Sequence, residues 1–203
     1  MYRELHEAEP AYPCIRQSPQ LANTIYKHDP AVRTDMTSLT FVLGGARSGK
    51  SRYAEELIAY HPAPWHYVAT AQALDDEMEE RIAHHRARRD ERWTTHDAPF
   101  DLVEMLAALP EGQPVLVDCL TLWLTNVMLA ERDVEAQTHR LAAALAKPRG
   151  SLVIVANEVG LGIVPDNALA RRFRDAAGRL NQMVAARADK VIFMVAGLPM
   201  AVK

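Results

Sequence analysis

Residues 44–51 read Gly-Gly-Ala-Arg-Ser-Gly-Lys-Ser, which fits the phosphate-loop pattern G-x-x-x-x-G-K-[ST]. The apolar run 39–43 directly before it predicts a strand, and the helical spacing of Tyr53, Leu57 and Ile58 after it predicts a helix. In that context the loop wraps backbone N–H groups around phosphate oxygens, and the start of the helix adds partial positive charge. The stretch therefore predicts a nucleoside triphosphate site and disfavours a chance match in a glycine-rich turn.

Further apolar runs are typical of strands buried on both faces of a parallel sheet. They are 65–69, 114–118, 152–156 and 190–195. Helical patterns alternate with these runs over 51–60, 75–89, 134–145 and 167–188, and either Asp166 or Asn167 can cap the last helix. The alternation predicts an α/β fold of the P-loop NTPase-like type, with three layers and a mainly parallel central sheet flanked by helices.

The composition describes an ordinary globular chain. Its 203 residues are 49% hydrophobic and 24% charged, which suits one domain with a sizeable core. A formal net charge of −3 provides no basic field for nucleic acid. Cys14 and Cys119 lie far apart and form no disulfide framework, so we expect Cys119 to be a buried free thiol and the protein to be cytoplasmic. No apolar run is long enough to span a membrane.

The first 36 residues differ from the rest, because they carry scattered prolines and mixed charge without sustained periodicity. We expect a disordered or loosely packed leader over 1–36, followed by a nucleotide-binding catalytic domain over 37–203.

The strand at 114–118 ends in Asp118, which resembles a Walker B element whose acid holds Mg²⁺. The alternative is an aspartate that caps the next segment. In the phosphate loop Lys50 would reach the β- and γ-phosphates, and Ser51 would ligate the metal. The predicted Mg²⁺ ligands are therefore Ser51 and Asp118. Glu158, which follows a later strand, is a further candidate acid or base.

The segment 75–89 changes from acidic to basic along its length, which suits the helix dipole. Helical spacing places Arg81, His85 and Arg89 on one face, where they could meet phosphate groups. From the pattern alone, a solvated and salt-bridged helix face is the favoured interpretation. The adjacent His84 and His85 point about 100° apart, so this pair makes a poor metal chelate.

Together these motifs resemble the bifunctional adenosylcobinamide kinase / adenosylcobinamide-phosphate guanylyltransferase family of cobalamin biosynthesis. The similar stretches run from 43 to 203. Besides the phosphate loop they include Tyr-Val-Ala-Thr-Ala-Gln-Ala-Leu-Asp-Asp-Glu-Met at 67–78, Arg-Ile-Ala-His-His-Arg-Ala-Arg-Arg at 81–89 and Asn-Glu-Val-Gly-Leu-Gly-Ile-Val-Pro-Asp-Asn at 157–167. Many families share the phosphate loop, whereas the blocks at 67–89 and 157–182 are specific.

The resemblance implies two reactions: phosphorylation of adenosylcobinamide with ATP or GTP, and transfer of GMP from GTP to adenosylcobinamide phosphate through a GMP–histidine intermediate. The family pattern Arg-Ile-x-x-His-[Arg/Lys] places the intermediate on His85, with His84 as the fallback. Arg81 and Arg89 are hypothetical stabilisers of the transferring group. The resemblance also implies a corrinoid substrate and a homotrimer.

Nucleotide contacts are implied for the phosphate loop and for positions after it that match the family. These are Gly44, Gly45, Ala46, Arg47, Ser48, Gly49, Lys50, Ser51, Gln72, Ala73, Leu74, Arg89, Asp90, Glu91, Arg92, Asp97 and Asp118. The chain departs from the family at Asp97, where Glu is frequent, and at Asp90, where Pro is frequent.

Three other functions remain possible from the sequence. One is a small-molecule P-loop kinase with a single activity. The others are an NTP-binding module or motor that acts on nucleic acid, and a nucleotide-dependent scaffold without turnover.

Overall fold

The computed structural model describes residues 37–73, 76–87 and 89–203, and all of them belong to one unit of the chain, Thr34–Lys203. The expected leader over 1–36 and the nucleotide contact expected at Leu74 lie outside the described residues.

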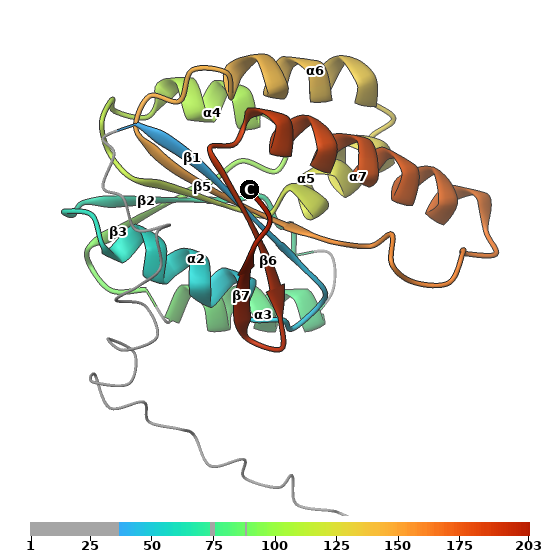
Figure 1. The fold of residues 1–203 in the computed structure, drawn as a ribbon, viewed down its shortest axis with the longest axis horizontal. Coiled ribbons are helices and arrows are strands. Elements are labelled where there is room, and N and C mark those ends of the chain that lie inside the picture. The colour runs from blue at the N-terminus through green and yellow to red at the C-terminus, as the bar shows by residue number, and fades with distance from the viewer. Residues whose placement is uncertain (1–36, 74–75, 88) are drawn as a thin grey trace, which may run out of the picture. The chain divides into compact units, whose positions relative to one another are not determined.

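The described residues form a seven-stranded sheet with the order β3-β2-β4-β5-β1-β6-β7 (Figure 1). The strands are β1 (Ser38–Gly44), β2 (Trp65–Ala69), β3 (Trp93–Asp97), β4 (Val115–Asp118), β5 (Ser151–Asn157), β6 (Lys190–Val195) and β7 (Leu198–Ala201). All neighbouring pairs are parallel except β6 with β7, which is antiparallel. The mainly parallel sheet predicted from the apolar runs is therefore confirmed.

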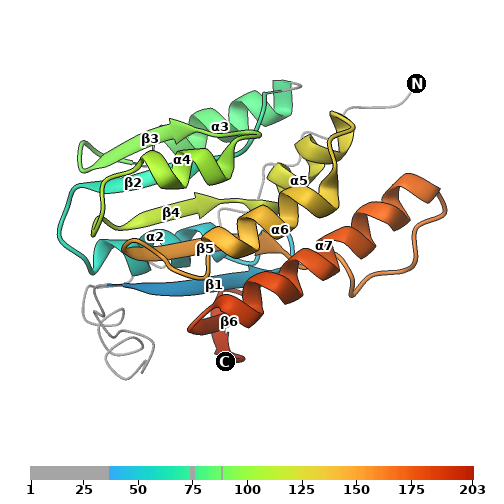
Figure 2. The same ribbon diagram turned by 90° about the horizontal axis from the view of Figure 1, so that it is seen from above.

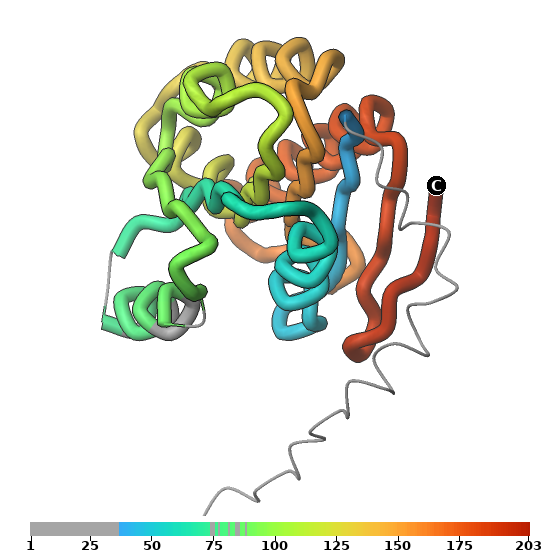
Figure 3. Tube along the Cα trace, turned by 90° about the vertical axis from the view of Figure 1, so that its left-hand side faces the viewer, coloured from blue at the N-terminus to red at the C-terminus, as the bar shows by residue number. Residues whose placement is uncertain are grey.

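Helices cover both faces of this sheet. They are α2 (Lys50–Ala59), α3 (Asp76–Ala87), α4 (Leu102–Ala108), α5 (Leu120–Leu129), α6 (Val134–Ala144) and α7 (Ala168–Arg187). The helices α2 and α3 lie on one side of the sheet, and α4 to α7 lie on the other (Figures 1 and 3). Seen from above, α5, α6 and α7 run alongside one another over the strands (Figure 2). This is the expected three-layer arrangement. None of the described helices combines the length and the apolar character needed to cross a bilayer.

Side chains at the helix ends explain where two helices begin. Asn167 caps α7, because its side-chain oxygen accepts a hydrogen bond from the backbone N–H of Ala170 at 2.7 Å. Asp133 caps α6 in the same way, through the N–H of Ala136 at 3.0 Å. Of the two capping residues expected for α7, Asn167 is therefore the one used.

The main core fills the space between the sheet and the helices α4 to α7. Phe41 and Ile154 are fully buried in the central strands, and Trp123 of α5 packs into the same cluster with no exposed surface. The indole N–H of Trp123 donates to the carbonyl oxygen of Phe100 at 2.9 Å, so its single polar atom is satisfied.

Some elements were not predicted. The strand β3 reads Trp-Thr-Thr-His-Asp and has two exposed threonines, because it is an edge strand with one neighbour, so it shows no apolar run. The helix α5 has apolar residues around most of its circumference, since it packs on β5, α6 and α7 together. A helix buried on several sides loses the periodicity by which helices are recognised.

Replacing Trp123 with alanine tests the core assignment. We expect Trp123→Ala to lower the free energy of unfolding by about 3–5 kcal/mol, because it opens a cavity and leaves the Phe100 carbonyl without its donor. Urea denaturation measures this loss. The matched control is Leu129→Ala on the same helix, whose side chain is 58% exposed and which should change stability by less than about 0.5 kcal/mol. Equal losses in both variants would contradict the assignment.

Candidate functional site

The candidate site lies at the carboxyl edge of the sheet, where strands β1 to β6 end. In the strand register Ala69 of β2 stands opposite Asp97 of β3 on one side and Asp118 of β4 on the other. Asp118 in turn stands opposite Val155 of β5, which pairs with Val42, two residues before the phosphate loop. Parallel pairing therefore brings Asp97, Asp118 and the phosphate loop to one edge, which is where α/β sheets bind ligands.

The phosphate loop joins β1 to α2 through a tight backbone path. Gly44 has a φ of 157°, and a Cβ at this position would stand 2.6 Å from the carbonyl oxygen of Met194 in β6. The N–H of Glu158 donates to the Gly44 carbonyl at 3.0 Å, and Gly49 caps α2 with a φ of 94°. These positions require glycine because a side chain would clash or strain the backbone.

The hairpin between β6 and β7 supports the loop from the other side. Its turn residues Ala196 and Gly197 both have positive φ angles, of 51° and 82°. The N–H of Gly197 donates to the Ser48 carbonyl at 3.0 Å. A Cβ on Gly49 would stand 3.4 Å from the Cα of Gly197. The loop is therefore held between the end of β5 and the β6–β7 turn.

Unsatisfied polar groups in the loop fit a phosphate ligand. The side-chain oxygen of Ser48 is buried and has no hydrogen-bond partner among the described residues. The ammonium of Lys50 donates to the Gly45 carbonyl at 2.5 Å and is otherwise buried. A buried hydroxyl without a partner is costly, and a phosphate oxygen would accept its hydrogen bond.

Burial lowers the pKa of Lys50 below its ordinary value, whereas negative charge on Cys119 or Asp118 acts to raise it. Burial also raises the pKa of the Cys119 thiol, to about 11. The thiol is therefore neutral near pH 7. The site places one cation and one carboxylate together in a partly dehydrated setting.

Tyr67 of β2 connects Asp118 to an arginine. Its hydroxyl donates to Oδ2 of Asp118 at 3.1 Å, and the guanidinium carbon of Arg89 lies 3.7 Å from the centre of its ring. Burial raises the pKa of Tyr67 well above its ordinary value, and the nearby Asp118 adds to the rise. Tyr67 therefore stays protonated and acts as a hydrogen-bond donor.

A hydrogen-bond network fixes the backbone that follows β2. The hydroxyl of Thr70 accepts from the N–H of Cys119 at 2.8 Å and donates to its carbonyl at 2.7 Å. The side chain of Asn126 donates to the Thr70 carbonyl at 2.8 Å. Gln72 and Ala73, two of the predicted nucleotide contacts, follow Thr70 by two and three residues. The network therefore fixes the backbone just before them. Neither Tyr67, Thr70 nor Asn126 was a candidate from the sequence, although Tyr67 and Thr70 lie inside the family-specific block.

The helix α3 carries the predicted histidines near its C-terminal end. Next to them, Arg86 pairs with Asp97 at the carboxyl end of β3, with 3.1 Å between nitrogen and oxygen. The pair places this end of α3 beside the carboxyl edge of the sheet. The side chains of Arg81, His84 and His85 lie outside the described part of the structure.

The structure places Asp90 and Arg92 away from the phosphate loop. Arg92 pairs with Asp90 at 2.6 Å, and its guanidinium lies 4.5 Å from the ring of Trp65, the first residue of β2. This is the amino end of that strand, opposite to the loop. Glu91 lies between them and is exposed. A nucleotide contact at these residues stays a prediction.

Glu158 directly follows β5 and lies next to the phosphate loop in space, since its N–H donates to the Gly44 carbonyl at 3.0 Å. Its carboxylate accepts the N–H of Gly160 at 2.5 Å, which closes a local turn, and the residue is part-exposed. A role as acid or base stays a prediction.

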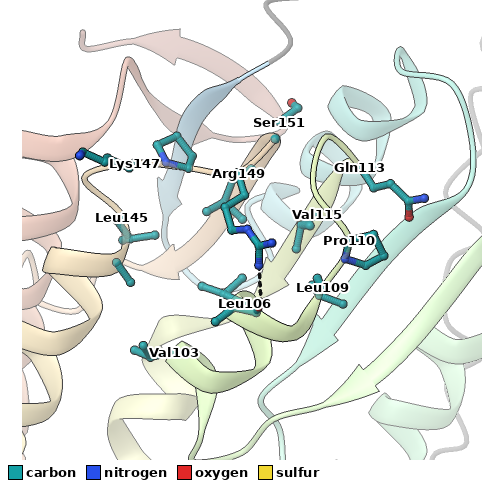
Figure 4. A pocket seen from close by; sticks show the side chains of 15 residues that line it. Val103, Leu106, Leu109, Pro110, Gln113, Val115, Leu145, Lys147, Arg149 and Ser151 are labelled. Atoms are coloured by element: carbon teal, nitrogen blue, oxygen red, sulfur yellow. Dashed lines mark hydrogen bonds between the residues drawn. The ribbon is translucent and has the colours of Figure 1, made fainter.

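A pocket of about 230 Å³ lies at the opposite, amino edge of the sheet, between α4 and the segments that precede β4 and β5. Its walls are mostly apolar, with Leu106, Val115 and Leu145 among them, and Arg149 reaches across to the carbonyl oxygen of Ala107 (Figure 4). Because the phosphate loop opens at the other edge, this pocket is separate from the candidate site.

The sequence of this chain is similar to the sequences of one known protein family. Residues 40–202 match the family described as cobinamide kinase / cobinamide phosphate guanyltransferase. The chain is 48% identical over 165 residues to the bifunctional adenosylcobalamin biosynthesis protein CobP of Pseudomonas aeruginosa, covering 80% of this chain and 95% of that protein. It is 41% identical over 181 residues to CobU of Salmonella typhimurium, covering 81% and 99%.

A solved structure supports the fold. The assembled ATPase EscN from the enteropathogenic E. coli type III secretion system superposes with a TM-score of 0.50 at 12% identity. The match covers 79% of this chain and 43% of that one. At this identity the likeness concerns the fold alone, and it agrees with the predicted P-loop NTPase-like architecture.

The variant Gly44→Ala tests the phosphate loop. A Cβ at this position must displace the Met194 carbonyl or the Ser48 side chain, so we expect the affinity for ATP to fall at least about tenfold. Equilibrium binding of a fluorescent ATP analogue measures the change. The matched control is Gly178→Ala in α7, where a Cβ meets nothing within 4 Å and affinity should be unchanged. Unchanged affinity in Gly44→Ala would contradict the assignment.

The Cys119 thiol gives a pH prediction. Because burial raises its pKa from 9.0 to about 11, native Cys119 should resist alkylation by iodoacetamide at pH 8, whereas urea should make it reactive. The same shift contributes stability that is present below pH 9 and is lost as the pH rises toward 11. Mass spectrometry of the peptide that contains Cys119 follows the alkylation. Rapid labelling of the native thiol would show that it is not buried as described.

Proposed function

This chain belongs to the cobinamide kinase / cobinamide phosphate guanyltransferase family, and we infer from that membership that it is a bifunctional transferase of cobalamin biosynthesis. It phosphorylates adenosylcobinamide with ATP or GTP. It then transfers GMP from GTP to adenosylcobinamide phosphate through a GMP–histidine intermediate, which gives adenosylcobinamide-GDP and pyrophosphate.

We assign the kinase step to the phosphate loop, residues 44–51. The substrate hydroxyl oxygen attacks the γ-phosphorus, the bond to the β,γ-bridging oxygen breaks, and the nucleoside diphosphate leaves. Charge builds up on the transferring group and the leaving oxygen, and a preorganised cation offsets it. Lys50 is suited to this role because its ammonium is buried and lies in the loop that cradles the phosphates.

We propose Ser51 and Asp118 as the residues that hold Mg²⁺. A hydroxyl and a carboxylate are hard oxygen ligands, which Mg²⁺ prefers, and it usually completes its shell with phosphate oxygens and water. The bound ion would neutralise charge on the phosphates.

We propose His85 as the nucleophile of guanylyl transfer, with His84 as the alternative. An imidazole nitrogen attacks the α-phosphorus of GTP, the bond to the β-phosphate oxygen breaks, and pyrophosphate leaves. A phosphate oxygen of adenosylcobinamide phosphate then attacks the same phosphorus, and the phosphorus–nitrogen bond breaks. The ion pair between Arg86 and Asp97, which holds this end of α3 at the carboxyl edge, supports the assignment.

Other nucleotide contacts are proposed on the same basis. Gln72, Ala73 and Asp97 lie at or directly beyond the carboxyl ends of β2 and β3. Arg81 and Arg89 are proposed to stabilise charge on the transferring GMP. Leu74 and the segment 90–92 are proposed from the family pattern alone.

We also propose that the enzyme is a homotrimer that works in the cytoplasm and does not bind nucleic acid. Apolar side chains in the segment between β5 and α7 support a contact between copies, since Leu161 and Ile163 are 81% and 97% exposed. The net charge of −3 supports the absence of nucleic acid.

Labelling with GTP tests the transferase assignment. Protein incubated with GTP labelled at the α-phosphorus should acquire acid-labile, alkali-stable label, because a phosphoramidate forms on histidine. His85→Ala should abolish this label, and His84→Ala should retain it. The reverse result would move the nucleophile to His84.

Two controls separate the transferase from a kinase with a single activity. His85→Ala should keep its kinase activity with adenosylcobinamide, whereas Lys50→Ala should lose kinase activity by about 100-fold or more while it stays folded. Active kinase without any label in the unmodified protein would contradict the histidine intermediate.

A further inference from the structure

Tyr67 makes two different contacts from one buried position. Tyr67 lies in the middle of β2 and is only 5% exposed. The hydroxyl donates to Asp118 at 3.1 Å, and the ring lies against the guanidinium of Arg89 at 3.7 Å. On another side, the ring meets Trp93 edge-on, with 6.2 Å between ring centres. The ring is therefore held in orientation by Asp118 and Trp93 and presents a face to Arg89.

Arg89 has unused hydrogen-bonding capacity. Its Nε and Nη1 are buried, and neither has a hydrogen-bond partner within the described ranges. Stacking on an aromatic ring compensates part of the cost of burying a guanidinium, but it satisfies none of the N–H groups. A guanidinium N–H that meets no protein acceptor can donate to an oxygen of a phosphate. These unpaired donors are therefore complementary to an anionic oxygen ligand.

These contacts connect Arg89 to the phosphate loop. Arg89 stacks on Tyr67, Tyr67 donates to Asp118, and Asp118 lies within electrostatic range of Lys50. Asp118 and Lys50 lie at the carboxyl edge, where the triphosphate is expected. A phosphate of the bound nucleotide is the anion that this position favours.

We propose that Tyr67 is a positioning residue for guanylyl transfer: its ring holds the Arg89 guanidinium in the orientation in which an unpaired N–H group donates to a phosphate of the bound GTP. This inference rests on the proposed function. Without the ring, an arginine in the segment after α3 would sample many rotamers, and it would lose entropy whenever it bound the phosphate. The ring orients the Arg89 guanidinium before GTP binds, and Tyr67 itself forms no bond to the reacting atoms.

Four variants test the ring separately from the hydroxyl. They are Tyr67→Phe, Tyr67→Leu, Arg89→Ala and the double variant Tyr67→Leu/Arg89→Ala. The readout is the single-turnover rate and the half-saturating GTP concentration for labelling of the protein from α-labelled GTP. Thermal unfolding of each variant shows that it is folded.

Tyr67→Phe keeps the ring, so its labelling rate should stay within about threefold of the unmodified enzyme. Tyr67→Leu should lower the rate about tenfold, close to the loss in Arg89→Ala. The double variant should be no slower than Arg89→Ala alone, because residues that act as a unit are not additive. If Tyr67→Leu does not fold, Tyr67→Met provides the same test, since it removes the ring but keeps a long apolar side chain, and it should resemble Arg89→Ala.

Three results would overturn the proposal: equal losses in Tyr67→Phe and Tyr67→Leu, additive losses in the double variant, or full activity of Arg89→Ala. These results differ from failure of the proposed function, in which the unmodified protein would take up no label at all. In that case the positioning role would fall with the transferase activity.

Discussion

The turn between β1 and α2 can follow its path only because Gly44 carries no side chain. A single added carbon would stand 2.6 Å from the Met194 carbonyl of the neighbouring strand β6. On the other side, the N–H of Glu158, directly after β5, donates to the Gly44 carbonyl. The two strands that flank β1 thus fix the shape of the phosphate loop, and the strand order β5-β1-β6 is a condition for the site as much as the loop sequence is.

The same parallel arrangement explains how one small domain serves two transfer reactions. Strands β2, β3 and β4 end in register, so the carboxylates of Asp97 and Asp118 stand on either side of Ala69. Asp118 lies within electrostatic range of Lys50. Asp97 forms an ion pair with Arg86, which lies near the C-terminal end of α3. Both reactions take place at a phosphorus atom of a nucleoside triphosphate. Both therefore need positive groups that offset the negative charge of the triphosphate.

Several charged and polar groups near the phosphate loop are buried, and their burial lowers the stability of the fold. Burial lowers the pKa of Lys50, and Ser48 and Arg89 keep buried polar atoms that no described residue satisfies. Such groups cost free energy unless a partner of opposite character is present. A bound triphosphate would be such a partner, which agrees with the nucleotide contacts proposed for these residues and is typical of functional sites. The apolar pocket at the amino edge of the sheet has no comparable set of unsatisfied groups among its described lining residues.

The sequence by itself determined the features that depend on local chemistry. The phosphate loop and the buried strands β1, β2, β4, β5 and β6 follow from short patterns, because backbone geometry and burial on both faces restrict which residues stand next to one another. For the start of α7 the sequence offered two caps, and only the structure chose Asn167. The edge strand β3 and the helix α5 show no such pattern. Their burial depends on elements that are distant in the sequence. Tertiary structure alone decided that Tyr67 lies between Asp118 and Arg89, because that contact depends on strand register and on the path of the chain after α3, and neither is encoded in any single stretch of sequence.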